Sequence, residues 1–260
     1  MALLLALALL PARAAAAGPG PGLDHAAFDS LLTRFVRDAD VDYAAWKADA
    51  AALAALDGYL ARLAEADTSG RPRAEQLALW INGYNAITVR RVLTAYPVSS
   101  ITRIRPTLGV FPGNGVWKEK HRVARAQVSL DDIEHGTLRR HFAEPRIHFA
   151  INCASKGCPP LAPRAYTAAL LEAQLDGAAR RFVDDDRWNS IAPGKPWRLS
   201  KIFDWYAADF TAAAGSVPAY VMRYAAPARV GAVDPARVRW TTGGYDWSLN
   251  QAPSARGNRP

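Results

Sequence analysis

The stretch LALWINGYNAITVRRV, residues 77–92, decides the fold. Four large side chains recur at the i, i+3, i+4 and i+7 positions of one helical face, namely Leu77, Trp80, Ile81 and Tyr84. Further apolar residues continue round the helix, so the stretch is not a simple amphipathic surface helix. The pattern predicts a helix over residues 73–95 that is central and mostly buried.

The elements on either side follow from apolar periodicity and capping residues. Further helices are predicted over 26–37, 48–66, 129–141, 168–184 and 201–213, with a short one after Ser216. Residues 146–152 alternate between apolar and polar and predict a strand, and residues 238–250 predict a strand, a Gly-Gly turn and an extended piece. Because helices dominate and no βαβ rhythm is present, the fold class is α+β: a helix-rich single domain around a small antiparallel sheet with a buried central helix.

The chain begins with MALLLALALLPARAAAAG, which resembles a secretory signal peptide. Its apolar run is too short to span a bilayer, which takes roughly 20 residues. The predicted organisation is a signal peptide over 1–17, a flexible lead-in over 18–25, a domain over 26–251 and a disordered tail over 252–260. The mature protein is therefore expected to be periplasmic or secreted.

The formal net charge is +8, with 32 Lys and Arg against 24 Asp and Glu. The basic residues are scattered along the sequence, whereas a nucleic-acid footprint is clustered and interleaved with exposed aromatic residues. We therefore expect no nucleic-acid partner and no membrane span. A weak association with anionic envelope surfaces is the simplest consequence of the charge.

Apart from the stretch with the cysteines, three blocks contain polar residues that could bind or catalyse. Asn82 and Asn85 are neighbours on the side of the central helix, and a buried amide without partners costs about 1–3 kcal/mol. They could hold a loop, or orient a ligand or an oxyanion. Glu134 and His135 lie in the middle of SLDDIEHGTLR (129–139), where the histidine could be structural, a base or a ligand.

The third block is YDWSLN, residues 245–250. Asp246 stands between two aromatic residues, where a partly desolvated carboxylate would seek a donor. It could orient a histidine as the third member of a triad, or simply cap a turn. Trp247 is a candidate binding residue beside it.

The only two cysteines, Cys153 and Cys158, lie in HFAINCASKGCPPL (148–161). In an uninterrupted strand His148 and Asn152 would share one face and Cys153 would point away from them, whereas Cys158 follows a turn and is free of that constraint. Four roles remain open for the cysteines: a disulfide, a nucleophile paired with a histidine, a reversible thiol–disulfide pair, or a Cys₂His₂ metal site with His135 and His148.

Five blocks in order then resemble domain-of-unknown-function family 547. They are WINGYNA (80–86), SLDDIEHGTLR (129–139), PRIHFAINCASKGCPPL (145–161), LSKIFDWYAADF (199–210) and YDWSLN (245–250). The resemblance implies a bacterial, often exported protein, or a plant or animal domain joined to glutaredoxin-like modules, which is consistent with thiol chemistry. The order of elements is also similar to the transglutaminase and papain-like fold, in which a central helix packs on an antiparallel sheet and begins with the nucleophilic cysteine. Here the corresponding helix carries Ile81, Asn82 and Asn85 instead.

The leading hypothesis is an exported cysteine-dependent enzyme, either hydrolase- or acyltransferase-like or thiol-handling, that acts on a small-molecule or peptide substrate without a cofactor or metal. The candidate catalytic residues are Cys158 or Cys153 as nucleophile, His135 or His148 as base, and Asp246 as orienting residue. The candidate binding residues are Asn82, Asn85, Glu134, Asn152 and Trp247. The alternative is a non-catalytic periplasmic binding or scaffold domain held by a Cys153–Cys158 disulfide.

Overall fold

The computed structural model describes residues 23–105 and 115–253. The predicted signal peptide, the first residues of the lead-in and the tail from residue 254 onward lie outside the described residues. Within the predicted tail, Ala252 is buried and its backbone N–H donates to the carbonyl oxygen of Val41. The folded part of the chain therefore extends slightly beyond the predicted domain end at residue 251.

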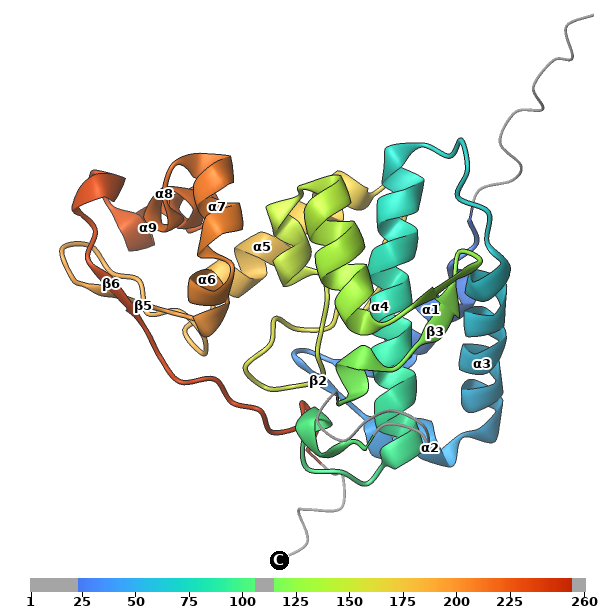
Figure 1. The fold of residues 1–260 in the computed structure, drawn as a ribbon. Helices are drawn as coiled ribbons and strands as arrows, with labels where there is room; N and C mark the ends of the chain where they lie inside the picture. Colours follow the sequence, from blue (N-terminus) through green and yellow to red (C-terminus); the bar gives the residue numbers. More distant parts are fainter. Residues whose placement is uncertain (1–22, 106–114, 254–260) are drawn as a thin grey trace, which may run out of the picture.

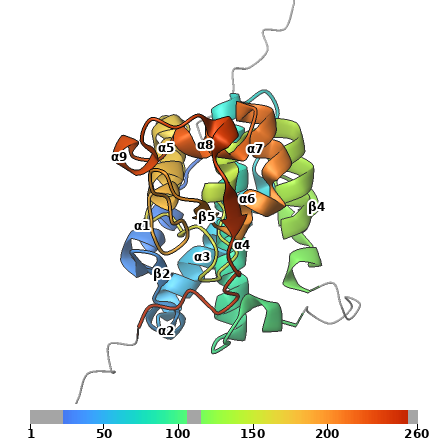
Figure 2. The same ribbon diagram turned by 90° about the vertical axis from the view of Figure 1, so that its left-hand side faces the viewer.

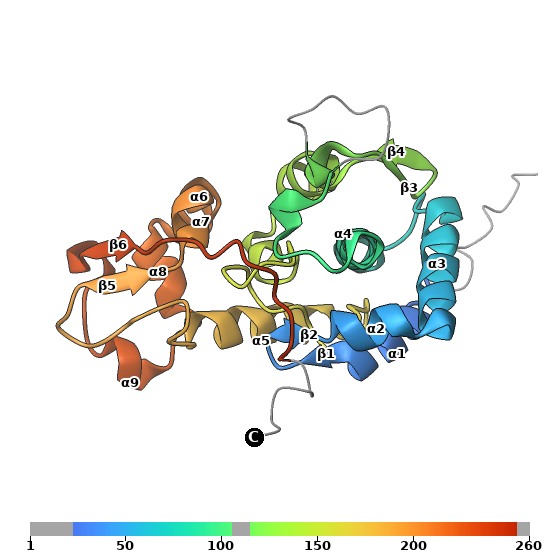
Figure 3. The same cartoon turned by 90° about the horizontal axis from the view of Figure 1, so that it is seen from below.

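The central helix α4 (Arg73–Ala95) has the bounds that the sequence predicts. Every residue from 81 to 89 is buried, so more than two turns are enclosed on all sides. Figure 3 shows α4 nearly end-on, with the other elements of the first half of the chain around it. The prediction of a buried central helix is confirmed.

The first half of the chain packs around α4 (Figure 1). Its elements are α1 (Ala26–Phe35), β1 (Val36–Arg37), β2 (Asp40–Val41), α2 (Tyr43–Ala48), α3 (Ala50–Glu65), η1 (Ile101–Arg103), η2 (Val116–Lys118), β3 (His121–Val123), β4 (Ala126–Val128), the π-helix η3 (Asp132–Phe142) and the 3₁₀ helix η4 (Pro145–Phe149). Helices α3 and η3 make the largest contacts with α4, and β3 packs on α3. The predicted capping box at the start of η3 is present, because Ser129 and Asp132 bond each other's backbone N–H groups.

The second half forms a separate hydrophobic core, on the left in Figure 1. Its elements are α5 (Leu171–Val183), β5 (Trp197–Leu199), α6 (Lys201–Trp205), α7 (Ala207–Ala214), α8 (Val217–Met222), α9 (Pro227–Val230), η5 (Pro235–Arg237) and β6 (Trp240–Thr242). Helix α5 joins the two cores: Leu171 and Leu175 belong to the first, and Phe182 and Val183 to the second. After β6 the chain returns across the molecule (Figure 1). Figure 2 shows β6 in front of the helices.

The fold class, a helix-rich α+β arrangement with small antiparallel sheets, is confirmed. The described strands form three separate two-stranded sheets, of which β1–β2 and β3–β4 are antiparallel and β5–β6 is parallel. Helix α4 packs chiefly on other helices. The arrangement of a central helix on an antiparallel sheet, expected from the transglutaminase-like comparison, is therefore absent from the described residues.

The predicted strand over residues 146–152 is wrong. Pro145 starts η4, Glu144 caps it by accepting from the Arg146 N–H, and the chain then runs on without a strand partner to residue 152. All residues from 147 to 152 are buried, including His148 and Asn152. The apolar–polar alternation reflected polar side chains buried with hydrogen-bond partners, and not a solvent-facing side of a strand.

Two asparagines of α4 hold the segment that carries the cysteines. The Asn82 amide donates to the carbonyl oxygen of Tyr166 at 2.8 Å and accepts from its N–H at 2.9 Å. The Asn85 amide donates to the carbonyl oxygen of Ala150 at 2.9 Å and accepts from the Asn152 N–H at 2.8 Å. Both ends of residues 150–166 are therefore fixed to one helix, three residues apart.

Replacing Asn82 by alanine should destabilise the protein strongly, because it leaves a buried N–H and a buried carbonyl of Tyr166 without partners. At about 1–3 kcal/mol for each group, we expect a loss of roughly 3 kcal/mol in the free energy of unfolding. Urea denaturation measures this loss. Thr94→Ala, an exposed position on the same helix, is the control and should cost less than about 0.5 kcal/mol. Equal stability of the two variants would show that the hydrogen bonds between Asn82 and Tyr166 do not stabilise the fold.

Candidate functional site

A cavity of about 90 Å³ lies where the two cores meet, and it contains both cysteines. It is lined by Tyr84, Trp117, Glu134, His148, Ile151, Cys153, Cys158, Ile202, Trp205, Tyr206, Tyr245 and Trp247. Five of these residues are candidates from the sequence: Glu134, His148, Cys153, Cys158 and Trp247. The structure therefore brings half of the predicted site residues to one place.

The loop that presents Cys153 is held tightly. The Asn152 side chain accepts from the N–H of Ala154 and donates to the carbonyl of Pro159, so it closes the loop from inside. Ala154 has a φ of 59°, a left-handed conformation that is uncommon for a residue other than glycine. Such strain persists only where the surroundings impose it, and it is often found at functional sites.

The C-terminal segment is the outer wall of the site. The N–H groups of Lys156 and Gly157 donate to the carbonyls of Ser248 and Asp246, respectively. A Cβ at position 157 would lie 2.9 Å from the Asp246 nitrogen and 2.9 Å from the Tyr245 ring. Glycine is required there because the two chain segments approach so closely, and this approach brings Tyr245 onto Cys153.

Cys153 is half-buried, and its sulfur is surrounded by hydrogen-bond donors. The hydroxyls of Ser155 and Tyr245 lie 3.1 Å from it, and the Cys158 thiol is a third partner. The bond from Cys158 contributes most, and the three together outweigh burial and nearby Glu134, so that the pKa of Cys153 falls to about 7. Since an ordinary cysteine has a pKa of about 8.5, a large fraction of Cys153 is thiolate at neutral pH.

The pKa of Cys158 is shifted in the opposite direction to that of Cys153. It is buried, and its sulfur accepts a hydrogen bond from the Cys153 N–H at 3.0 Å. Burial and the neighbouring Cys153 raise the pKa of this thiol well above its usual range. Both cysteines are free thiols in this structure, so the disulfide is not formed here. The argument that Cys153 points away from His148, whereas Cys158 is free of that constraint, rested on the wrong strand at 146–152.

His148 is buried beside the cysteines and is paired with Asp209. Its Nε2 lies 2.7 Å from an Asp209 oxygen, and its ring stacks on Tyr206 with 3.7 Å between ring centroids. Arg139 forms an ion pair with the same carboxylate at 2.7 Å. Although burial opposes it, hydrogen bonds from His148 and Arg139 lower the pKa of Asp209, which is therefore ionised.

This pairing fixes the protonation of the imidazole. Burial lowers the pKa of His148 despite the hydrogen bond that the ring donates to Asp209, so the ring is neutral near pH 7. Because ionised Asp209 can only accept, the single ring proton must be on Nε2. Nδ1 then carries a lone pair, and no described residue bonds to it. His148, a residue that lines the cavity containing Cys153, thus has a buried basic nitrogen without a partner among the described residues.

Glu134 lies on the cavity wall and accepts two hydrogen bonds. Tyr206 donates to it at 2.5 Å and Tyr84 at 3.2 Å. The carboxylate therefore holds the Tyr206 ring, which in turn stacks on His148. The pKa values of both tyrosines are raised, chiefly by burial and then by the nearby Glu134 charge.

An aromatic cluster surrounds the cavity, made of Trp117, Trp205, Tyr245 and Trp247. Trp205 is 44% exposed and Trp247 is 38% exposed, and both contact Tyr245 with ring centroids 4.8 and 4.6 Å apart. Trp117 packs edge-on against Trp247 at 6.0 Å. A contiguous cluster of exposed aromatic residues beside a cavity is typical of a recognition surface.

Two predicted residues lie elsewhere. His135 is exposed on η3, near Arg139 and Asp131, and lines no part of the cavity, because its neighbour Glu134 takes the inward position. Asp246 is exposed and accepts from the backbone and hydroxyl of Ser248, so it caps a turn. A triad of Cys158, His135 and Asp246 is therefore not the arrangement in this structure.

The three predicted asparagines support the loop and do not line the cavity. Asn82, Asn85 and Asn152 each bond to backbone groups on both their oxygen and nitrogen atoms. The sequence left open whether Asn82 and Asn85 hold a loop or orient a ligand, and in the structure they hold the loop.

Several site residues were not predicted from the sequence, chiefly Ser155, Tyr206, Asp209 and Tyr245. For Tyr245 a signal was present: in an extended segment, residues 245 and 247 point to one side and 246 to the other. This parity favours Tyr245 and Trp247 over Asp246. Asp209 had no such signal, because it approaches His148 only through the packing of α7 on η4.

Comparison with known proteins confirms the resemblance. Residues 68–183 match the model of the family described as "Protein of unknown function, DUF547". The match covers α4, η3 and the cysteine loop, and ends with α5. Neither the curated proteins nor the solved structures gave a match to the chain.

Two further properties concern only the described residues. No group of three or more His, Cys, Asp or Glu side chains there is arranged to hold a metal ion. The Cys₂His₂ site considered from the sequence is not assembled, since His135 lies away from the cysteines. In the same part of the chain no helix has the length and apolar character needed to cross a membrane.

The alkylation rate of Cys153 should follow its pKa. In the reduced protein, reaction with iodoacetamide should be about tenfold slower at pH 6 than its plateau, reach half-maximum near pH 7 and be close to maximal at pH 8, as the thiol loses its proton. Mass spectrometry of the digested protein identifies the modified cysteine.

Tyr245→Phe tests the cause of this shift, because it removes one donor and keeps the ring. The midpoint should rise by up to about one pH unit. Tyr224→Phe, a tyrosine away from the cavity, is the matched control and should leave the midpoint unchanged. A midpoint near 8.5 in the unmodified protein would show that the donors do not act on the sulfur.

Proposed function

We propose that the protein is an exported cysteine-dependent enzyme that hydrolyses or transfers acyl groups, with Cys153 as nucleophile and His148 as base. One observation carries the proposal: a thiol surrounded by donors and a neutral histidine with a free ring nitrogen line the same cavity. Thiol-handling chemistry at the same sulfur is the close alternative. The proposed export rests on residues 1–17 alone.

The reaction begins with proton transfer from the Cys153 thiol to Nδ1 of His148. The thiolate attacks a carbonyl carbon, and a sulfur–carbon bond forms while the carbonyl π electrons move to oxygen. When the tetrahedral species collapses, the bond to the leaving group breaks and His148 returns the proton to it. Water, or another acceptor nucleophile, then attacks the thioester and regenerates the thiol, so atoms and charge balance.

The remaining polar groups of the site position the imidazole and stabilise the charges that develop during the reaction. Asp209 fixes the imidazole tautomer and stabilises the imidazolium, as an orienting carboxylate does. The hydroxyls of Ser155 and Tyr245, 2.9 Å from each other and beside the sulfur, are donors for a developing oxyanion. Glu134 acts through Tyr206, whose ring holds the imidazole in place.

The size of the cavity limits what enters it. About 90 Å³ is far below the roughly 300 Å³ of pockets that enclose whole ligands. Only the reacting group can occupy this space, and the rest of the substrate must lie outside on Trp205 and Trp247. The proposal therefore favours a substrate with a flat or apolar portion next to its carbonyl.

An activated aromatic ester should acylate Cys153. With p-nitrophenyl acetate, we expect a burst of one p-nitrophenolate per protein and a matching mass increase on the peptide that contains Cys153. His148→Asn should slow acylation by about 100-fold, as expected for loss of a general base. Stopped-flow absorbance and mass spectrometry measure the two quantities.

The matched control is His141→Asn, an exposed histidine on η3, which should acylate at the rate of the unmodified protein. Cys153→Ala should give no burst, and circular dichroism establishes whether it remains folded. Acylation that persists in Cys153→Ala, or that is equal in the two histidine variants, would refute the assignment.

Thiol counting separates the enzyme from the scaffold alternative. The two sulfurs are neighbours, so oxidation could join them. Titration of the exported, unreduced protein with a thiol reagent should find two free thiols under the enzyme hypothesis. No free thiol, together with a large loss of stability on reduction, would support a disulfide-held scaffold.

A further inference from the structure

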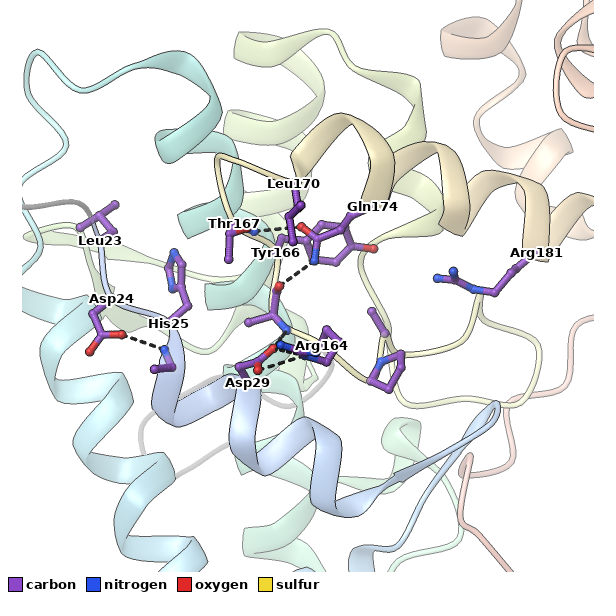
Figure 4. A pocket seen from close by; sticks show the side chains of 14 residues that line it. Leu23, Asp24, His25, Asp29, Arg164, Tyr166, Thr167, Leu170, Gln174 and Arg181 are labelled. Atoms are coloured by element: carbon purple, nitrogen blue, oxygen red, sulfur yellow. Dashed lines mark hydrogen bonds and ion pairs between the residues drawn. The ribbon is translucent and has the colours of Figure 1, made fainter.

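A second cavity, of about 550 Å³, lies between the start of α1, residues 162–167 and α5 (Figure 4). It shares no lining residue with the cavity that contains the cysteines. Its volume is within the range of about 300–1,000 Å³ that is typical of small-molecule sites. It is therefore a separate candidate for ligand binding.

Much of the wall of this cavity is apolar. Leu23, Ala162, Pro163 and Leu170 line it, and Leu170 is 57% exposed, more than any other large hydrophobic residue in the described part of the chain. An exposed leucine beside a concave surface gains free energy when an apolar ligand covers it, by about 25 cal/mol per Å² buried. The body of the ligand should therefore be apolar.

Most polar groups around the cavity already have partners. Asp29 binds Arg164 and the Ala165 N–H, and the Gln174 amide binds backbone groups of Thr167 and Ala165. Asp24, at the end of the cavity opposite Arg181 in Figure 4, accepts from the N–H of Ala26. Each of these side chains is therefore already engaged by a neighbouring group of the protein.

Two side chains that line the cavity, Arg181 and Tyr166, have polar groups without a partner among the described residues. Arg181 is an exposed residue that lines the cavity, and it forms no ion pair with any carboxylate of the described residues. The hydroxyl of Tyr166, a residue that is 1% exposed, bonds to no described group. In Figure 4 this hydroxyl points toward the side where Arg181 lies. A buried hydroxyl without an acceptor costs about 1–3 kcal/mol, so an oxygen atom placed there would be stabilised.

We propose that this cavity binds a monocarboxylate with an apolar body, such as a medium-chain fatty acid. The carboxylate accepts from the Arg181 guanidinium and the Tyr166 hydroxyl, and the apolar body lies along Leu170 toward Leu23. A single guanidinium with one hydroxyl matches the single charge and two oxygens of a carboxylate. A phosphate would bring a second charge that no other unpaired cation of this cavity balances.

Isothermal titration calorimetry with decanoate tests the proposal. We expect saturable binding of one decanoate per chain, with decanol and decyltrimethylammonium at least tenfold weaker. Arg181→Gln should weaken decanoate binding by about tenfold, as for loss of one charge-assisted hydrogen bond. Tyr166→Phe should weaken decanoate binding severalfold and leave decanol binding unchanged.

Arg180→Gln is the matched control, since it makes the same charge change one residue earlier on α5, where the side chain faces Tyr224. It should bind decanoate with the affinity of the unmodified protein. Leu170→Asp, at an exposed position, should abolish binding without loss of folding. Equal affinity for the three head groups, equal effects of the two arginine variants, or no saturable binding would overturn the proposal.

Discussion

The two amide clamps on α4 are the constraint on which the rest of the structure depends. Asn82 and Asn85 each satisfy one N–H and one carbonyl of a chain segment that has no regular secondary structure of its own. A buried irregular segment otherwise carries backbone groups that cannot be paired. The clamps allow residues 150–166 to run through the interior, with Cys153 and Cys158 between the two fixed points.

The environment of Cys153 shows how a thiolate can be stabilised without a nearby cation. Burial and the charge of Glu134 both disfavour the anion. Three short-range donors outweigh them, because hydrogen bonds to a charged group are about twice as strong as neutral ones. Asp209 is stabilised differently, because the cation of Arg139 bonds to its carboxylate together with His148 and keeps it ionised against burial. At Cys153, by contrast, hydrogen-bond donors and not a neighbouring cation lower the pKa.

The sequence predicted the helices well because their signals are local. The bounds of α4 and the capping box at Ser129 follow from periodicity and from contacts three residues apart. The strand at 146–152 failed because the alternation was assigned to the two faces of a strand, whereas His148 and Asn152 are buried like their apolar neighbours, each with a partner far away in sequence. Polarity indicates exposure only when no such partner exists, and one sequence does not reveal it.

Several residues of the candidate site could be predicted from the sequence, but not which of them contact one another. Both cysteines, His148 and Glu134 were among the expected residues, whereas Asp209 depends on how α7 docks against η4. The choice between Glu134 and His135 illustrates the difficulty: adjacent helical residues point in different directions, and only the packing of η3 decides which one faces inward.

The position of the site between two cores has a consequence for how the protein responds to stress. Cys153, Glu134 and Tyr84 are held by the first core, whereas Asp209, Tyr206 and Tyr245 come from elements of the second. Undocking of α6, α7 and the segment after β6 would leave α1–α4 packed on one another and yet remove the orienting carboxylate and the outer wall together. Reactivity at the cysteine would then vanish before secondary structure does, so the chemistry itself reports whether the two halves of the molecule are joined.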